Sequence, residues 1–370
     1  MKTFLHPLQN LAEMEAIYTK AKSNRGILEI SGCMESQKAH LIYGLSGLFT
    51  SHLILAEDEK AAKELYEDYR FYDKNVYYYP AKDLLFFQAD IHGNLLLRQR
   101  MRVIKALLEQ KENITVVTSI DGCMDYLQPL DKIEKQLIHF RNDSTLDMDK
   151  LKDALVHMGY ERVGQVEMPG QFSVRGGIVD IYSLTEENPW RIELWGDEID
   201  SIRTFDSQSQ RSLENLDEIM IYPATEQPAE KGGVSFLDYF AEKNSLVFLD
   251  EPNRLEENAR AVEEEFRQSC ENRQQKGEEN ISQNWMCRWE DLNHKLNNRN
   301  CISVSLMEPK RADWKITEQF NLTVKSMSSY QSSFELLVKD LRQYKKQGYQ
   351  IMLLSGSRTR AERLANGSAG

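Results

Sequence analysis

The chain has 370 residues, of which 41% are hydrophobic and 28% charged, which is ordinary for a soluble globular protein with room for two or three domains. Its formal net charge of −12 gives no general attraction to phosphate backbones, so DNA binding would need a local basic patch, and we find only short ones such as Arg98, Arg100 and Arg102. The five scattered cysteines include no CxxC pair, no apolar run has the length of a membrane span and the first residues lack the apolar centre of a signal peptide, so we expect reduced thiols, no zinc site and a cytoplasmic protein.

The first part of the chain alternates between apolar, β-branched runs and amphipathic stretches. Such alternation is typical of a parallel α/β sheet, whose strands are connected by helices. Residues 1–24 are predicted to form one helix with a basic end. The further predicted strands are 26–31, 52–56, 76–79 and 114–119, and the further predicted helices are 58–71 and 95–110.

The loop after the first predicted strand reads GCMESQKA and is compared with the phosphate-binding pattern GxxxxGK[ST]. Gly32 and Lys38 stand where that pattern requires them. Gln37 replaces the second glycine, which makes the tight phosphate cradle harder to form, and Ala39 removes the hydroxyl that would bind magnesium. Glu35 adds a carboxylate where a polyanion would bind. The sequence therefore predicts a degenerate, inactive nucleotide site.

A densely patterned region near the middle of the chain predicts a four-stranded sheet over residues 172–174, 178–183, 190–195 and 199–205. Because side chains alternate along a strand, Arg191 and Trp195 should share one face of the third strand. A tryptophan between ionisable neighbours indicates a face outside the core. One interpretation is a half-exposed sheet whose tryptophan covers a neighbouring helix. The other is a partner-binding face, since Trp and Arg are enriched at interface hot spots.

A later apolar strand, followed by Asp250 and Glu251, resembles a second nucleotide-binding motif, Walker B. In an active site the Asp would hold magnesium through water and the Glu would activate the attacking water. Acidic residues after a buried strand are also ordinary helix-capping chemistry. Because the loop at Gly32 is already degenerate, we interpret both as capping residues, and we expect no cofactor and no metal in this chain.

The last part of the chain mixes charged and apolar segments. A strongly charged helix is predicted first, and Trp285 and Trp289, at helical spacing, are interpreted as core. One strand and two helices then end the chain, too little for an independent domain, so we expect a fragment cut inside its third domain. The predicted elements are a helix over 254–276, a strand over 314–324, a helix over 333–347, a strand over 349–355 and a helix over 358–365.

The run from Phe172 to Glu226 carries a family resemblance. It is similar, residue after residue, to the module shared by the nucleotide excision repair protein UvrB and the transcription-repair coupling factors (Mfd). The segments VRGGIVDI and DSQSQRS are more similar to the coupling factors than to UvrB. Taken with the degenerate loop and the Asp-Glu strand, the resemblance covers almost the whole chain and indicates the N-terminal UvrB-like region of that family.

The resemblance implies an α/β fold. A degenerate P-loop helicase-like (UvrB-like) parallel-sheet subdomain would carry an inserted mixed α/β sheet domain and lead into the start of a further α/β domain. The implied boundaries are 1–128 for the first part of the UvrB-like domain, 129–222 for the inserted UvrA-binding-type domain, 223–325 for the second part of the UvrB-like domain and 326–370 for the linker and truncated third domain.

The resemblance also implies a function. In that family this region recruits UvrA to stalled RNA polymerase and is not itself an enzyme. The polymerase- and DNA-binding domains and the ATP- and magnesium-dependent translocase lie further along, in sequence absent here. The UvrA-binding residues would be an Arg in the VRG turn, an Arg opening the RIEL strand and the aromatic at its end, which are Arg175, Arg191 and Trp195 here.

Two alternatives remain open at this stage. The chain would be a UvrB-like DNA-dependent ATPase if its Walker loop were complete, or a damaged-DNA-binding subunit if it carried a folded basic patch. UvrB has a long aromatic hairpin that grips DNA in the region corresponding to residues 82–94. The connection here is shorter and lacks the hairpin's tyrosines, so that function is not carried over.

Overall fold

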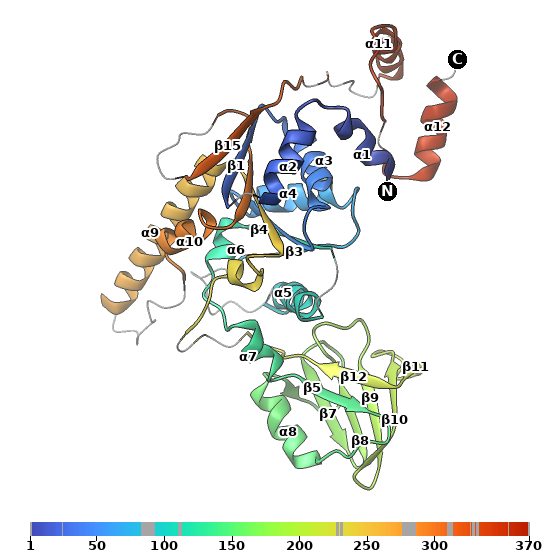
Figure 1. The fold of residues 1–370 in the computed structure, drawn as a ribbon. Coiled ribbons are helices and arrows are strands. Elements are labelled where there is room, and N and C mark those ends of the chain that lie inside the picture. Colours follow the sequence, from blue (N-terminus) through green and yellow to red (C-terminus); the bar gives the residue numbers. More distant parts are fainter. Residues whose placement is uncertain are drawn as a thin grey trace.

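Two separate sheets organise the protein, as its computed structural model shows (Figure 1). A seven-stranded sheet with helices on both faces forms the body. A six-stranded sheet forms a second unit, which the chain enters after the first four strands of the body and leaves before the last three. The structure describes residues 2–23, 25–82, 93–109, 113–226, 229, 232–275, 286–308, 314–325, 327, 330, 333–353 and 355–368.

The body sheet is parallel throughout. Three of its strands are buried along their whole length, as expected for continuous apolar runs covered on both faces. The expected strands after residues 25, 51, 75 and 113 are confirmed. The strand order is β15 (Ile316–Asn321), β1 (Gly26–Ser31), β14 (Asn300–Val304), β13 (Ser245–Asp250), β2 (Ser51–Ala56), β4 (Ile114–Ser119) and β3 (Val76–Tyr79).

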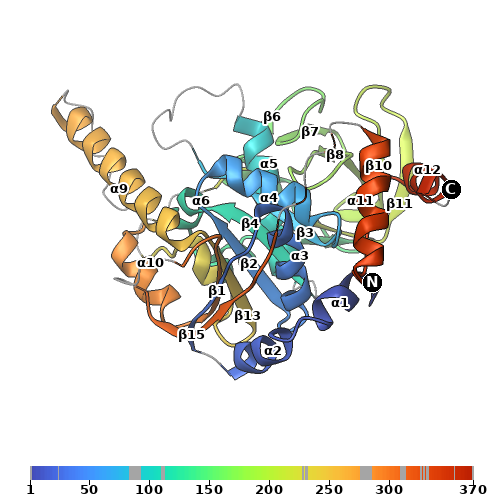
Figure 2. The same cartoon turned by 90° about the horizontal axis from the view of Figure 1, so that it is seen from above.

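Helices cover both faces of this sheet, and each face has its own apolar core (Figure 2). The single helix expected over residues 1–24 is wrong, because two shorter helices stand there. Asp58 begins α4 by accepting a hydrogen bond from the Ala61 amide at 2.7 Å. One face carries α1 (Lys2–Gln9), α2 (Met14–Ser23), α3 (Glu35–Ser46) and α4 (Glu59–Tyr69); the other carries α5 (Gly93–Leu108), α6 (Ile120–Met124), η1 (Phe236–Tyr239), α9 (Pro252–Gln275) and α10 (Trp289–Leu296).

The second unit contains the four strands expected from the sequence and two edge strands that were missed. The missed strands are a two-residue strand and the exposed run SLENL, neither of which shows apolar alternation. Gly176 and Gly196 make the hairpin turns, with φ of +61° and +66°. The sheet order is β11 (Ser212–Leu216), β10 (Glu198–Phe205), β9 (Trp190–Trp195), β8 (Ile178–Ile181), β7 (Gln171–Arg175) and β6 (Glu161–Arg162), accompanied by α7 (Leu130–Glu134), α8 (Met148–His157) and the pair β5 (Ile138–Arg141) with β12 (Glu218–Ile221).

The end of the chain differs from expectation in one element. The strand predicted over 349–355 is wrong: the described residues there form none, and Ile351, Met352 and Leu353 are exposed. An apolar run needs a neighbouring strand, and none of the described strands lies beside it. The helices α11 (Phe334–Lys346) and α12 (Arg358–Ser368) are confirmed. No helix in the described ranges combines the length and apolarity that a membrane crossing requires.

Tryptophan burial tests the core interpretation at residues 285 and 289. Trp289 is 1% exposed and meets Trp314 edge to face, with ring centroids 5.6 Å apart. The core interpretation is therefore confirmed for Trp289. Trp285 lies outside the described residues.

Candidate functional site

The outer face of the six-stranded sheet gathers the residues that the sequence singled out. Strand register places Asp180 opposite Arg191, and Arg191 opposite Arg203 on the next strand, so these side chains lie on one side of the sheet. Alternation adds the neighbours two residues away along each strand. We call this surface the recognition face, and its members are Ser173, Arg175, Ile178, Asp180, Arg191, Glu193, Trp195 and Arg203.

Asp180 anchors the recognition face. Its carboxylate is 1% exposed and accepts hydrogen bonds from Arg175 Nη2 at 2.6 Å, Arg191 Nε at 2.7 Å and Arg191 Nη2 at 2.9 Å. Arg191 also lies over the Phe205 ring, 4.2 Å from its centroid. The hydrogen bonds to Asp180 raise the pKa of Arg191 above its ordinary value. One buried carboxylate thus holds two guanidinium groups in fixed positions.

Exposure differs sharply among the three predicted partner-binding residues. The Trp195 residue is 83% exposed, the Arg175 side chain 47% and the Arg191 side chain only 13%. The Leu194 amide donates to the Gly177 carbonyl at 2.8 Å, which joins the turn after Arg175 to the end of β9. Arg175 and Trp195 are therefore the accessible members, and they lie at the same end of the sheet.

The expectation that this face lies outside the core is wrong at Arg191. From the alternation alone, reversing the charge of Arg191 would be expected to leave the fold intact. The structure instead buries most of Arg191 against Asp180 and Phe205. A Glu at this position would face the buried Asp180 carboxylate, so the change would destabilise the sheet as well as the surface.

Asp180 itself was missed as a site residue. The signal was present in the strand IVDI, where a single carboxylate stands between two apolar residues and period two places it on the face opposite them. Its partners come from two other segments of the sequence, so their pairing depended on strand register.

The degenerate nucleotide site forms a second cluster, at the carboxyl ends of β1 and β13. Lys38 is 1% exposed, and its Nζ lies 2.8 Å from Glu35 Oε1, 2.7 Å from Asp250 Oδ1 and 2.9 Å from Glu251 Oε1. An ammonium group has three protons, and three carboxylates surround this one. Glu251 also accepts from the Leu306 amide at 2.8 Å. The side chains of Asp250, the last residue of β13, and of Glu251 thus both bind Lys38. Glu251 also stands directly before α9, and its carbonyl accepts from the Leu255 amide at 3.1 Å. The helix-capping interpretation is therefore wrong for the two carboxylates, which hold Lys38 instead.

The backbone of the loop differs from a phosphate cradle. Helix α3 begins at Glu35, and the amides of Gln37 and Lys38 both donate to the Met34 carbonyl, at 2.8 Å and 3.2 Å. A phosphate-binding loop directs such amides at its ligand. At Gly32 φ is +79°, and an added Cβ would lie 2.0 Å from the Leu322 carbonyl oxygen, because the chain after β15 passes over the loop.

The pKa values of Lys38 and Asp250 depend on each other in this cluster. Burial raises the pKa of Asp250 to about 6, and Lys38 opposes part of that rise. Burial alone would lower the pKa of Lys38, but Asp250 and its neighbours raise it above the ordinary value. Counting one ammonium against three carboxylates, the ionised cluster carries a formal charge of −2.

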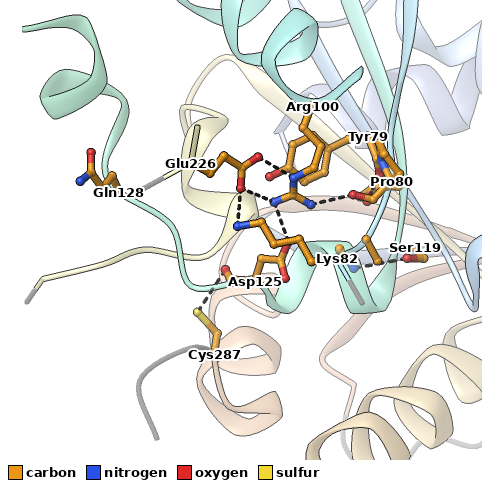
Figure 3. A network of polar contacts seen from close by, with 12 residues as sticks. Tyr79, Pro80, Lys82, Arg100, Ser119, Asp125, Gln128, Glu226 and Cys287 are labelled. Atoms are coloured by element: carbon orange, nitrogen blue, oxygen red, sulfur yellow. Dashed lines mark hydrogen bonds and ion pairs between the residues drawn. The ribbon is translucent and has the colours of Figure 1, made fainter. Parts of the chain in front are cut away.

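The short basic run on α5 forms no free patch. Arg100 is 0% exposed and sits in a network of internal ion pairs (Figure 3). Arg98 Nη2 donates to the Glu186 carbonyl at 2.6 Å. The expectation of even a short exposed patch at Arg98 and Arg100 is therefore wrong, and two of its three positive charges are used inside the protein.

Comparison with known proteins supplies the family context. Residues 138–226 match the UvrB interaction domain family. The chain is 28% identical over 414 aligned residues to a transcription-repair-coupling factor of Bacillus subtilis (strain 168), covering 91% of this chain and 35% of the relative. It is 25% identical over 350 residues to that of Staphylococcus epidermidis (strain ATCC 12228 / FDA PCI 1200), covering 79% and 30%. It is 36% identical over 153 residues to that of Staphylococcus aureus (strain Mu50 / ATCC 700699), covering 41% and 13%.

These matches confirm the resemblance to the transcription-repair coupling factors and the α/β fold class with separate parallel and mixed sheets. The chain spans about a third of the length of the first two of these relatives. The recognition face lies wholly inside the matched residues 138–226.

Proposed function

We propose that this chain is the UvrA-recruiting, N-terminal part of a transcription-repair coupling factor and that it works as a protein-interaction module without catalytic activity of its own. The observation that carries the proposal is the exposure of Arg175, which the buried Asp180 anchors, and of Trp195 at the same end of one sheet face within the matched UvrB interaction domain. Recruitment to stalled RNA polymerase, and the ATP-driven translocase on DNA, belong in this proposal to parts of the protein beyond these 370 residues.

The recognition face suits a protein partner for two physical reasons. Trp and Arg are the residue types most enriched at interface hot spots, and here one of each is accessible. Asp180 fixes the guanidinium of Arg175 before any partner arrives, which lowers the ordering cost of binding. Planar guanidinium groups also pair with carboxylates through two hydrogen bonds, so an acidic surface on UvrA would match this face.

The test is calorimetric titration of purified UvrA with the 370-residue chain. Trp195→Ala and Arg175→Glu should each weaken binding by about 30-fold, equivalent to about 2 kcal/mol. Val156→Ala is the matched control, because Val156 is 58% exposed on α8 of the same unit and lies off the recognition face. Parent-like UvrA binding by both recognition-face variants would overturn the proposal.

The ATPase alternative is tested separately. Lys38 already donates to Glu35 and Glu251 and forms an ion pair with Asp250, and the nearby amides are used inside α3, which leaves little to bind a triphosphate. Titration with magnesium-ATP should give no measurable heat of binding. A micromolar dissociation constant would restore the enzyme interpretation.

The DNA-binding alternative has its own test. An acidic chain whose Arg98 and Arg100 are engaged internally would release few counterions from DNA. Mobility shifts over a salt series should therefore show only weak binding to undamaged and damaged duplexes near physiological salt. Tight, steeply salt-dependent binding would contradict this.

A further inference from the structure

The second unit is joined to the body by two crossings of the chain. The outgoing crossing runs from Asp125, just after α6, to the start of α7. The returning crossing runs from Tyr222, after β12, to Glu226. Both pass beside α5, which lies between the body and the second unit (Figure 1).

A single guanidinium group binds both crossings (Figure 3). Arg100, on α5, places Nη2 2.7 Å from Asp125 Oδ2 on the outgoing crossing. Its Nε and Nη2 lie 2.6 Å and 3.0 Å from the two carboxylate oxygens of Glu226 on the returning crossing. Its Nη1 donates to the Pro80 carbonyl at 2.6 Å, at the end of β3. The group therefore ties the two crossings to each other and to the body sheet.

The network is buried and balanced in charge. Arg100 is 0% exposed and lies over the ring of Tyr79, 4.1 Å from its centroid. Lys82 adds a second cation by pairing with Glu226. Two cations thus face two carboxylates. A buried ion pair is seldom the most stable way to fill a core, so its retention at this position suggests a role in fixing geometry.

The returning crossing is itself hydrogen-bonded to the second unit. The Ala224 amide donates to the Met158 carbonyl at 2.8 Å, and the Tyr160 hydroxyl donates to the Tyr222 carbonyl at 2.7 Å. Glu226 follows directly, so the residues before it are fixed to the second unit while its own carboxylate is fixed to α5.

Two more α5 side chains reach the second unit at one point. Arg98 Nη2 donates to the Glu186 carbonyl at 2.6 Å, and Lys105 Nζ lies 2.6 Å from Glu186 Oε1. Lys105 is 26% exposed, so its ion pair is weaker than the buried network. Helix α5 thus supports the second unit at its edge, whereas Arg100 holds its two chain connections.

We propose that Arg100 is a positioning residue: by holding Asp125 and Glu226 together it fixes the orientation of the second unit, and hence of the recognition face, relative to the body. The functional consequence rests on the proposed UvrA recruitment, whereas the orientation itself does not. Without the guanidinium group, the crossings would act as ordinary linkers, and motion between the units would become the default.

The test measures the distance between the units by electron spin resonance. Spin labels are attached through Lys63→Cys on α4 and Glu214→Cys on β11, both exposed, in the 370-residue chain with Cys287→Ser. The parent should give one narrow distance distribution. Arg100→Lys keeps the charge but lacks the planar fork that binds both carboxylates, so the distribution should broaden by about twofold or more. Arg267→Lys, at an exposed guanidinium that pairs with acidic residues of its own helix α9, is the matched control and should stay narrow.

A second variant keeps the test decisive if Arg100→Lys fails to fold. The triple change Arg100→Met, Asp125→Asn and Glu226→Gln removes the guanidinium group and both carboxylates together. No carboxylate is then left buried and unpaired. The triple variant should fold and still broaden the distribution. A parent-like distribution in the folded variants would overturn the proposal and reduce Arg100 to a stabilising residue.

UvrA titration separates this proposal from the proposed function. The Arg100 variants should bind UvrA within about threefold of the parent, because the recognition face is distant and keeps its own contacts. Loss of binding in Trp195→Ala alone supports UvrA recruitment whatever the spin-label result. A broadened distribution together with parent-like UvrA binding by both Trp195→Ala and Arg175→Glu would leave the Arg100 proposal standing and remove only the proposed function.

Discussion

Two ion clusters of opposite design stand in the two units of this protein. In the body, a buried cation, Lys38, is surrounded by three carboxylates. In the second unit, a buried anion, Asp180, holds two arginines, one of which reaches the surface. In the Lys38 cluster, called closed below, the Asp250 and Glu251 side chains are mostly buried and the exposed partner, Glu35, is an anion. In the Asp180 cluster, called open, the exposed partner, Arg175, is a cation. Comparable residue types therefore leave opposite charges at the surface of the two units.

The difference lies in which group is buried and which charge is left over. Around Lys38 the formal excess is −2, which repels phosphate groups even where space is found. Around Asp180 the excess is +1, and it is carried partly by the half-exposed Arg175. Burial of the central group holds the geometry in both clusters, while the sign of the charge on the exposed partner, Glu35 or Arg175, decides which ligand outside could bind it.

The largest expected effect breaks the closed cluster. Lys38→Met should lower the free energy of unfolding by about 4 kcal/mol, because Asp250 and Glu251 would lose their cation while remaining mostly buried. Urea denaturation measures the change. Lys20→Met is the control, since its ion pair with Glu318 is half exposed and should contribute under about 1 kcal/mol. Equal losses in the two variants would show that the Lys38 cluster is not structural.

Breaking the open cluster should cost somewhat less. Asp180→Asn should lower the free energy of unfolding by about 3 kcal/mol, because Arg191 stays mostly buried without a counter-charge. UvrA binding should fall as well, since Arg175 loses its anchor. Arg175→Met should affect stability by under about 1 kcal/mol, because its side chain is 47% exposed. If Asp180→Asn weakened neither stability nor binding, the anchor role would be refuted.

The closed cluster should also respond to pH. The pKa of Asp250 is about 6 in the folded state, above the ordinary 3.8, so the folded protein holds this proton more tightly than the unfolded chain. The resulting stabilisation is complete below pH 3.8 and is lost as pH rises through about 6. Relative to Asp250→Asn, the parent should lose about 3 kcal/mol of unfolding free energy over this window. A parent–variant difference that stays constant would contradict the assignment.

The smallest expected effect on stability is at Trp195, the most exposed residue of the recognition face. Trp195→Ala should change the free energy of unfolding by under about 0.5 kcal/mol, since the residue is 83% exposed. The same variant is expected to lose UvrA binding, so stability and recognition would separate at this position. A melting temperature well below the parent's would instead make Trp195 a structural residue.

Local pattern predicted much of the architecture. The strands β1, β2, β3 and β4 and the hairpins at Gly176 and Gly196 follow from apolar runs and turn residues. The same alternation placed Arg191 and Trp195 on one face, as the register bears out. The edge strand β11 was missed because its two leucines, Leu213 and Leu216, fall on opposite faces and show no apolar alternation. The strand expected at 349–355 does not form because none of the described strands lies beside it.

The chemistry of the clusters could not be predicted in the same way. Lys38 and Asp250 are far apart in sequence, and only the parallel order of β1, β14 and β13 brings them together. Alternation says which face a side chain points to, but it does not reveal that Asp180 is buried beneath two arginines or that Arg100 faces both crossings. Such long-range pairing depends on packing between segments, which one sequence does not display.

The two crossings that meet at Arg100 bear on how such a protein changes over generations. The body sheet takes no strand from residues 126–225, so its order is complete without them. Because the segment departs and returns at neighbouring points, it has the topology of an inserted cassette, for which a short turn would suffice in its absence. Gain, loss or exchange of the second unit would therefore leave the strand order of the body sheet unchanged, so a lineage could alter this unit without rebuilding the sheet that carries it.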